Sequence, residues 1–293
     1  MRTLYVNDMD LRPFSPNAAQ RQRAARELNY QPFILSDDLQ TGAAYSWVKG
    51  TDPRVKPQLV FQRRQHNAEE WERITDANRR LAAMYDDMLD AVAKRFPGGR
   101  LLDVACNNGY FPVGAELRGM RGYGVDLGPY ASALSVLNDI CGTHASFRRC
   151  AYDPRTHNVR RWAGYGPRLF SRHDVVVASA IMCHLPDPLY FLAELARLGD
   201  AILFWGQMLS SDHLLVSYQQ PHTALSLPRL FPHCFNDNTR ISRGLFDLAM
   251  RRLGFREVIE LTGEHWLKEL MAPTVFPDEV STGSQHRALL AVR

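Results

Sequence analysis

The chain has 293 residues, of which 45% are hydrophobic and 23% charged, and its formal net charge is +4. That length fits one large domain or two small ones, and the apolar fraction excludes a wholly disordered or fibrous protein. No apolar run reaches the roughly 18 residues needed to cross a bilayer, and the first 20 residues lack the apolar stretch of a secretory leader, so we expect no membrane partner.

The first 66 residues show no regular hydrophobic period. Five prolines interrupt them, at positions 13, 16, 32, 53 and 57. A short apolar stretch, residues 32–35, could form a strand, but the segment as a whole predicts an irregular N-terminal extension.

A long amphipathic helix follows this extension. Asn67 and Glu70 have the spacing of a capping box, in which each side chain bonds the backbone N–H of the other residue. Apolar residues then recur at helical spacing as far as Val92, and Gly98 with Gly99 is expected to end the helix.

After residue 99, short apolar runs alternate with amphipathic stretches. The pattern predicts strands at 101–105, 122–126, 146–152, 174–180 and 201–208, and helices at 111–117, 130–140, 188–198 and 241–253. Two final strands are expected at 255–261 and 287–292, with no helix between them. This alternation is typical of an α/β fold, here a seven-stranded, mostly parallel sheet with an antiparallel last strand and helices on both faces.

Two carboxylates stand where such a sheet binds ligands, outside the carboxyl ends of its strands. Asp103 lies inside the first apolar strand, where burial is costly unless something hydrogen-bonds the carboxylate. The turn after it uses small or turn-forming residues, and the next helix start can aim backbone N–H groups at a ligand. Asp126 ends the second strand, 23 residues further on, at a position suited to a ribose diol. The spacing therefore fits a nucleoside ligand.

Residues 103–109 with Asp126 resemble the S-adenosylmethionine site of Rossmann-like methyltransferases. The likeness continues through residues 174–188, which include the family's histidine-leucine-x-aspartate-proline pattern, and it covers residues 98–293. It implies a methyltransferase domain at 67–293 that uses S-adenosylmethionine, with substrate-side insertions at 154–173 and 209–240. The residues that the resemblance implies for cofactor binding are Asp103, Ala105, Asn107, Gly109, Asp126, Asp153, Ser179 and Ala180.

This chain departs from the family at two positions that usually hold glycine, here Ala105 and Asn107. Alanine is a small change and asparagine tolerates left-handed backbone well, so the loop can still form. For Asp153 the alternative to a cofactor contact is a turn cap.

His184 follows the fourth strand, close to the place where the methyl group should emerge. It is our candidate general base, because an imidazole titrates near neutral pH, and the alternative is a histidine that shapes the following turn. For the acceptor we expect side chains at the end of the fifth strand and in the long insertion, which is a usual place for binding loops. These are Trp205, Gln207, His213, Tyr218 and Arg240, although Trp205 could instead belong to the core.

Cysteine and arginine usage add two constraints. The five cysteines have no paired spacing, so we expect reduced thiols in a cytoplasmic protein, with neither disulfides nor a metal site. Only four of the 35 basic residues are lysines, and seven arginines lie between 148 and 172 against one acid, Asp153. This run is either a solvated loop or a surface for an anionic acceptor.

Three functions remain. The first is methyl transfer from S-adenosylmethionine to a hydroxyl of a small-molecule or glycan-type acceptor. The second is RNA (carboxy)methyl transfer. It is suggested by the arginine run and by a similarity of Glu70, Trp71 and residues 38–42 to the bacterial tRNA wobble-uridine carboxymethyl transferases. A net charge of +4 does not favour nucleic acid as the partner. The third is a cofactor-binding module without catalysis, suggested by the two replaced glycines.

Overall fold

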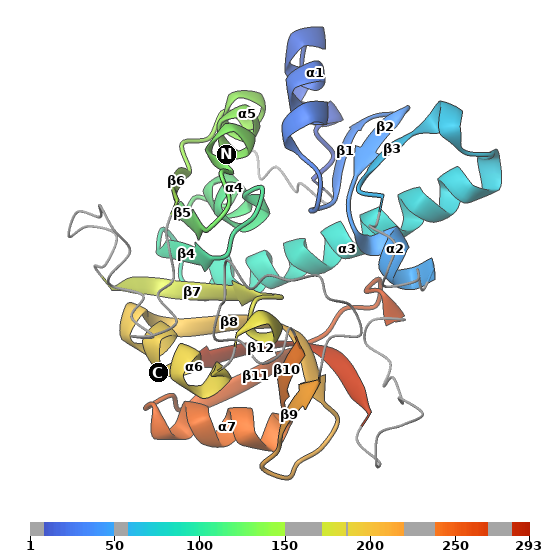
Figure 1. Cartoon of the computed structure of the whole chain (residues 1–293). Coiled ribbons are helices and arrows are strands. Elements are labelled where there is room, and N and C mark those ends of the chain that lie inside the picture. The colour runs from blue at the N-terminus through green and yellow to red at the C-terminus, as the bar shows by residue number, and fades with distance from the viewer. Residues whose placement is uncertain (1–8, 50–57, 150–171, 186, 220–237, 269–282) are drawn as a thin grey trace. The chain divides into compact units, whose positions relative to one another are not determined.

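The computed structural model describes residues 9–49, 58–149, 172–185, 187–219, 238–268 and 283–293 (Figure 1). The chain forms two compact units. Unit 1 is Met1–Arg149 with Gly263–Glu269, and unit 2 is Cys150–Thr262 with Leu270–Arg293. The boundary expected at residue 66 stays a prediction, and much of the two expected insertions lies outside the described residues.

Regular structure begins in the N-terminal segment, where the sequence predicted an irregular extension. The helices and 3-10 turns are η1 (Arg12–Phe14), α1 (Ala18–Glu27), α2 (Ala44–Lys49) and η2 (Arg63–Gln65). Three strands form an antiparallel sheet, in the order β1 (Phe33–Ser36), β2 (Leu39–Thr41) and β3 (Val60–Gln62). The strand suggested at 32–35 coincides with β1. The other elements have little hydrophobic period because the strands are very short and α1 buries only Ala24.

The long helix is confirmed as α3 (Ala68–Arg95). Asn67 caps it, since its side chain accepts the backbone N–H of Glu70 at 2.9 Å. The other half of the predicted capping box is wrong, because the Glu70 carboxylate instead accepts from the Tyr45 hydroxyl at 3.2 Å and lies 3.0 Å from His66 Nδ1. Figure 1 shows the small sheet and α2 gathered at one end of α3.

The rest of unit 1 follows the predicted alternation. Its elements are β4 (Arg100–Val104), α4 (Tyr110–Leu117), β5 (Arg121–Asp126), α5 (Ala131–Cys141) and β6 (Ser146–Arg149). The three strands are parallel neighbours in the order β4, β5, β6. Two glycines let β5 approach the next layer closely: a Cβ on Gly122 would lie 2.0 Å from the carbonyl oxygen of Pro112, and one on Gly124 would lie 2.6 Å from Cys106 Sγ.

Unit 2 contains the second part of the predicted pattern. Its elements are β7 (His173–Ser179), η4 (Met182–His184), α6 (Pro188–Leu198), β8 (Gly199–Leu209), β9 (Val216–Gln219), β10 (Asn238–Ile241), α7 (Arg243–Arg252), β11 (Glu257–Leu261) and β12 (Ser284–Val292). Strand β7 is parallel to β8, whereas β12 is antiparallel to both β8 and β11. The antiparallel last strand is thereby confirmed. The antiparallel pair β9 and β10 was not predicted.

The main sheet has seven strands, in the order β11-β12-β8-β7-β4-β5-β6. This confirms the predicted fold class, an α/β Rossmann-like sheet that is mostly parallel and flanked by helices. Among the described residues, no helix is long and apolar enough to cross a membrane. Within the same residues, no group of three or more potential ligands could hold a metal ion.

Candidate functional site

The loop after β4 and the end of β5 meet in unit 1, as the sequence predicted. Strands β4 and β5 are parallel and in register, with Val104 opposite Val125, so both reach the same edge. There Asp126 Oδ2 accepts the backbone N–H of Asn107 at 2.9 Å, and its Oδ1 accepts that of Gly128 at 2.8 Å. The predicted residues Asp103, Ala105, Asn107, Gly109 and Asp126 therefore form one cluster.

Asp103 is a buried carboxyl without a hydrogen-bond partner among the described residues. Its side chain is 1% exposed, and neither carboxyl oxygen is bonded. Burial raises the pKa of Asp103 well above its usual range, and the nearby charge of Asp126 raises it further. The group therefore keeps its proton to a higher pH than an ordinary aspartate, unless a cation or a hydrogen-bond donor comes next to it.

Asp126 has a different environment. Burial raises its pKa, but the backbone N–H groups of Gly128, Asn107 and Leu127 oppose that rise by stabilising the charged form. A carboxylate has about four acceptor positions, so Asp126 can still receive a hydroxyl donor beside the backbone N–H groups of Asn107, Gly128 and Leu127. Asp126 is half-buried, so a ligand can reach it.

Ala105 and Asn107, which stand at positions that usually hold glycine, adopt the left-handed backbone that glycine favours. The φ angle is 66° at Ala105 and 49° at Asn107, both in the left-handed region. Gly109 follows with φ 100°, where a Cβ would lie 2.3 Å from Leu134 Cδ1. The loop thus has the predicted close turn, but two of its residues carry side chains in a conformation that L-amino acids disfavour.

The backbone N–H groups of this loop are already donated within the protein. The acceptors for residues 105 to 110, in order, are Val125 O, Val125 O, Asp126 Oδ2, Asn107 Oδ1, Cys106 O and Gln31 Oε1. The sequence predicted that the start of α4 would aim such groups at a ligand. In this structure the amides from Ala105 to Tyr110 instead hold the loop in shape.

Sequence reasoning missed two residues at this cluster. Gln31, from the N-terminal segment, bonds the loop at Cys106 and the start of α4 at Tyr110, and only its three-dimensional position reveals it. Tyr130 has its hydroxyl 3.5 Å from Asn107 Nδ2, and its pKa is raised by burial and by the charge of Asp126. An aromatic residue four positions after Asp126 was a signal that could have been used.

In unit 2, the end of β7 carries two of the predicted cofactor residues. Ser179 and Ala180 are both half-buried, and the Ala180 N–H donates to the carbonyl oxygen of Trp205 at 2.7 Å. Ala180 also has a left-handed backbone, with φ 52°. His184 is exposed on the turn η4 that follows. Asp153 lies outside the described residues.

The predicted acceptor residues in unit 2 fall into two environments. Arg240 is 4% exposed, and its Nε donates to Gln207 Oε1 at 2.9 Å, so β10 and β8 place these two side chains together. Trp205 is fully buried with its ring centroid 5.2 Å from that of His286, which favours the core alternative. His213 is exposed, and Tyr218 lies in β9 opposite Thr239.

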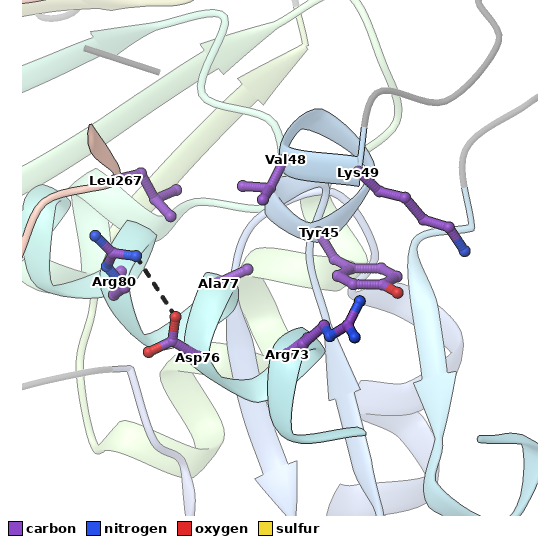
Figure 2. A pocket seen from close by; sticks show the side chains of 8 residues that line it. All are labelled: Tyr45, Val48, Lys49, Arg73, Asp76, Ala77, Arg80 and Leu267. Atoms are coloured by element: carbon purple, nitrogen blue, oxygen red, sulfur yellow. Dashed lines mark ion pairs between the residues drawn. The ribbon is translucent and has the colours of Figure 1, made fainter. Parts of the chain in front are cut away.

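A separate pocket of about 310 Å³ lies in unit 1 against α2 and α3 (Figure 2). Figure 2 labels three cations around it, Lys49, Arg73 and Arg80. Each has an acidic partner: Glu70 at 3.5 Å from Lys49, Glu69 beside Arg73, and Asp76 at 3.6 Å from Arg80. The charges balance, so the pocket offers no net attraction to an anion, and none of the predicted site residues lines it.

A family model described as a methyltransferase domain matches residues 64–260. No curated protein matches the chain. Among solved structures, the N-terminal domain of EvdMO1 in the presence of SAH and D-fucose is 15% identical, with 71% of this chain and 82% of that chain covered and a TM-score of 0.49. Magnesium protoporphyrin IX methyltransferase (ChlM) from Synechocystis PCC 6803 with bound SAH is 16% identical, with 78% and 89% covered and a TM-score of 0.44. An O-methyltransferase family protein from Burkholderia thailandensis is 15% identical, with 79% and 62% covered and a TM-score of 0.45. The comparisons give no support to the tRNA carboxymethyl transferase branch.

Proposed function

The chain belongs to the methyltransferase-domain family and is an S-adenosylmethionine-dependent methyltransferase, and we propose that it methylates a hydroxyl of a small-molecule or glycan-type acceptor. The cofactor supplies an electrophilic methyl group on a sulfonium. The protein then has to hold the cofactor, orient the acceptor and remove one proton from the hydroxyl.

The observation that carries the proposed cofactor site is the pair of acids at the ends of β4 and β5. Asp103 has two buried, unbonded oxygens, and the charge of Asp126 raises its pKa. A ligand with a net positive charge relieves this arrangement, because a cation stabilises both carboxylates. S-adenosylmethionine has such a charge, since its sulfonium and ammonium outweigh one carboxylate. The residues present therefore fit the cofactor.

Each residue of the site has a proposed role. Asp126 accepts hydrogen bonds from the ribose hydroxyls through the acceptor positions that its backbone donors leave open. Ala105, Asn107 and Gly109 give the turn that lets the backbone approach the methionine portion. We assign Asp153 to the adenine amine and Ser179 with Ala180 to the amino-acid end of the cofactor.

For the acceptor, His184 is proposed as the general base. Its exposure on η4, directly after β7, supports this assignment because the imidazole is accessible to a bound hydroxyl compound. Gln207 and Arg240 support a polar, hydroxyl-rich acceptor, since their side chains are held together at 2.9 Å as a preformed donor and acceptor pair. His213 and Tyr218 complete the proposed acceptor set, and Trp205, which is fully buried, is assigned to the core beneath it.

Calorimetric titration with S-adenosylhomocysteine tests the cofactor site. We expect the wild type to bind and Asp126→Ala to raise the dissociation constant at least tenfold, because ribose hydrogen bonds to a charged acceptor are worth about 1.5–3 kcal/mol. Asp139→Asn is the matched control, since Asp139 is 55% exposed on α5 of the same unit and pairs with Arg23. Its dissociation constant should equal that of the wild type.

Absence of binding heat in the wild type would sink the proposed site, and equal constants for wild type and Asp126→Ala would remove Asp126 from it. The acceptor is tested by measuring S-adenosylhomocysteine release in the presence of monosaccharides, small phenols and total tRNA. We expect release with a hydroxyl compound, and release with tRNA alone would replace the proposal by RNA modification.

A further inference from the structure

The N-terminal segment reaches the loop between β4 and α4 through buried amide side chains. Gln31 Nε2 donates to the carbonyl oxygen of Cys106 at 3.3 Å, while Gln31 Oε1 accepts the backbone N–H of Tyr110 at 3.0 Å. Gln31 is 6% exposed, so both bonds are shielded from water. One side chain therefore joins the carbonyl in the middle of the loop to the first N–H of α4.

The loop makes the reciprocal connection through Asn108. Its Oδ1 accepts the backbone N–H groups of Asn29 at 3.0 Å and Tyr30 at 3.2 Å, and its Nδ2 donates to the carbonyl oxygen of Glu27 at 3.4 Å. Asn108 is fully buried. Segment and loop are thus bonded from both sides over residues that lie about 80 positions apart in the sequence.

Gln31 is itself fixed by the small sheet. Its carbonyl oxygen accepts from Thr41 Oγ1 at 2.8 Å, and the neighbouring Tyr30 carbonyl accepts the Ala43 N–H at 2.9 Å. Residues 30 and 31 therefore have their backbone held by β2 and the start of α2, so the amide of Gln31 meets the loop from a defined position.

The loop needs such support because of its own backbone. Ala105 and Asn107 have left-handed φ angles of 66° and 49°, which cost free energy in residues with a Cβ. Such a conformation persists only where the surrounding contacts impose it. Gln31 bonds the two residues, Cys106 and Tyr110, that lie within and just beyond the strained part.

We propose that Gln31 is a positioning residue for cofactor binding: by bridging Cys106 and Tyr110 it holds the non-glycine loop in the shape that receives S-adenosylmethionine. This inference rests on the proposed cofactor site. It makes the N-terminal segment a part of that site, although Gln31 acts through the loop and not through contact with the reacting atoms.

The chain offers a matched control in Gln40. It lies on β2 of the same segment and is 1% exposed. Like Gln31, it donates one side-chain hydrogen bond and accepts another: its Nε2 donates to Thr75 Oγ1 at 2.7 Å, and its Oε1 accepts from Asn78 Nδ2 at 3.1 Å. Its partners belong to α3 and not to the loop. Gln31→Met and Gln40→Met therefore remove the same kind of buried amide from the same segment.

The experiment compares wild type, Gln31→Met and Gln40→Met by S-adenosylhomocysteine titration, thermal unfolding and amide hydrogen exchange without ligand. We expect Gln31→Met to raise the dissociation constant at least fivefold and to speed exchange of the Tyr110 amide at least tenfold. Gln40→Met should lower the melting temperature about as much as Gln31→Met does, but leave the dissociation constant and the Tyr110 exchange rate within twofold of the wild type. If Gln31→Met does not fold, Gln31→Glu and Gln40→Glu replace the methionine pair. Gln31→Glu keeps an acceptor for the Tyr110 N–H but loses the amide donor to Cys106, so exchange at Tyr110 should stay slow while the dissociation constant rises more than in Gln40→Glu; equal dissociation constants in the two glutamate variants would overturn the inference.

Equal losses of affinity in the two methionine variants, in proportion to their melting temperatures, would overturn the inference, because Gln31 would then support the fold alone. Unchanged exchange at Tyr110 in Gln31→Met would overturn it as well. Failure of the proposed function looks different: the wild type itself then gives no binding heat, whatever the variants do.

Discussion

Replacement of Asp103 by asparagine probes the buried carboxyl directly. In the folded protein the pKa of Asp103 is raised by burial and by Asp126, whereas in the unfolded chain it returns to about 3.9. Between these two pKa values the folded state binds the proton and the unfolded state does not. The free energy of unfolding therefore falls as pH rises above about 4, until the folded-state pKa is passed.

The slope of this loss follows from proton linkage. One proton held only by the folded state costs about 1.4 kcal/mol per pH unit, so moving from pH 5 to pH 6 removes about that much stability. The amide in Asp103→Asn has no proton to retain and nearly the same size. We therefore expect the stability of the variant, relative to the wild type, to increase from pH 5 upward by at most about 1.4 kcal/mol per pH unit, and to level off once the folded-state pKa of Asp103 is passed.

Urea unfolding at pH 5, 6 and 7 in one buffer mixture measures this difference. Asp139→Asn corrects for the loss of one carboxylate, because Asp139 is 55% exposed on α5. A difference between wild type and Asp103→Asn that is the same at pH 5 and pH 7 would refute the reasoning. It would mean that Asp103 is ionised in the folded state and has a compensating donor.

Two further substitutions test the loop and the proposed base. Ala105→Gly removes a side chain from a left-handed residue, a relief of about 1–2 kcal/mol that the extra freedom of glycine in the unfolded chain offsets by about 0.4–1 kcal/mol. The melting temperature in calorimetry should therefore rise by up to roughly 6 °C, and a lower melting temperature would contradict the strain. His184→Ala should reduce turnover by about 10²–10⁴ with unchanged affinity for S-adenosylhomocysteine, because only the proton-transfer step is lost. Retained turnover would assign His184 to the turn.

The sequence predicted the strands and the site correctly wherever a clear apolar pattern or a rule of sheet geometry applied. The strands β4, β5 and β7 were predicted to within one or two residues. Strands β4 and β7 are mostly buried apolar residues, whereas β5 was predicted from its place between two helical stretches as much as from its own apolar residues. The meeting of Asp103 with Asp126 followed from their places at the carboxyl ends of parallel strands. Neither step needed side-chain geometry.

The N-terminal segment could not be predicted in this way. Helix α1 has no apolar residue larger than alanine and buries only Ala24, so it has no apolar stripe to detect. The capping box failed for a related reason: Glu70 has the right spacing, but Tyr45 and His66 compete for its carboxylate, and these partners come from other elements. Hydrogen bonds between distant segments leave no period in the sequence.

The two departures from expectation are physically linked. Ala105 and Asn107 occupy positions that usually hold glycine in the family, and the sequence predicted an irregular N-terminal extension. In the folded protein the N-terminal segment supplies the support that the strained loop requires. Gln31 bonds the loop at Cys106 and at Tyr110, while Ala105 and Asn107 keep φ angles of 66° and 49°. A loop of glycines can reach the left-handed region without help, and a loop with side chains reaches it only under external constraint. It follows that glycine at position 105 should make cofactor binding less dependent on Gln31, since it removes part of the strain that the glutamine opposes.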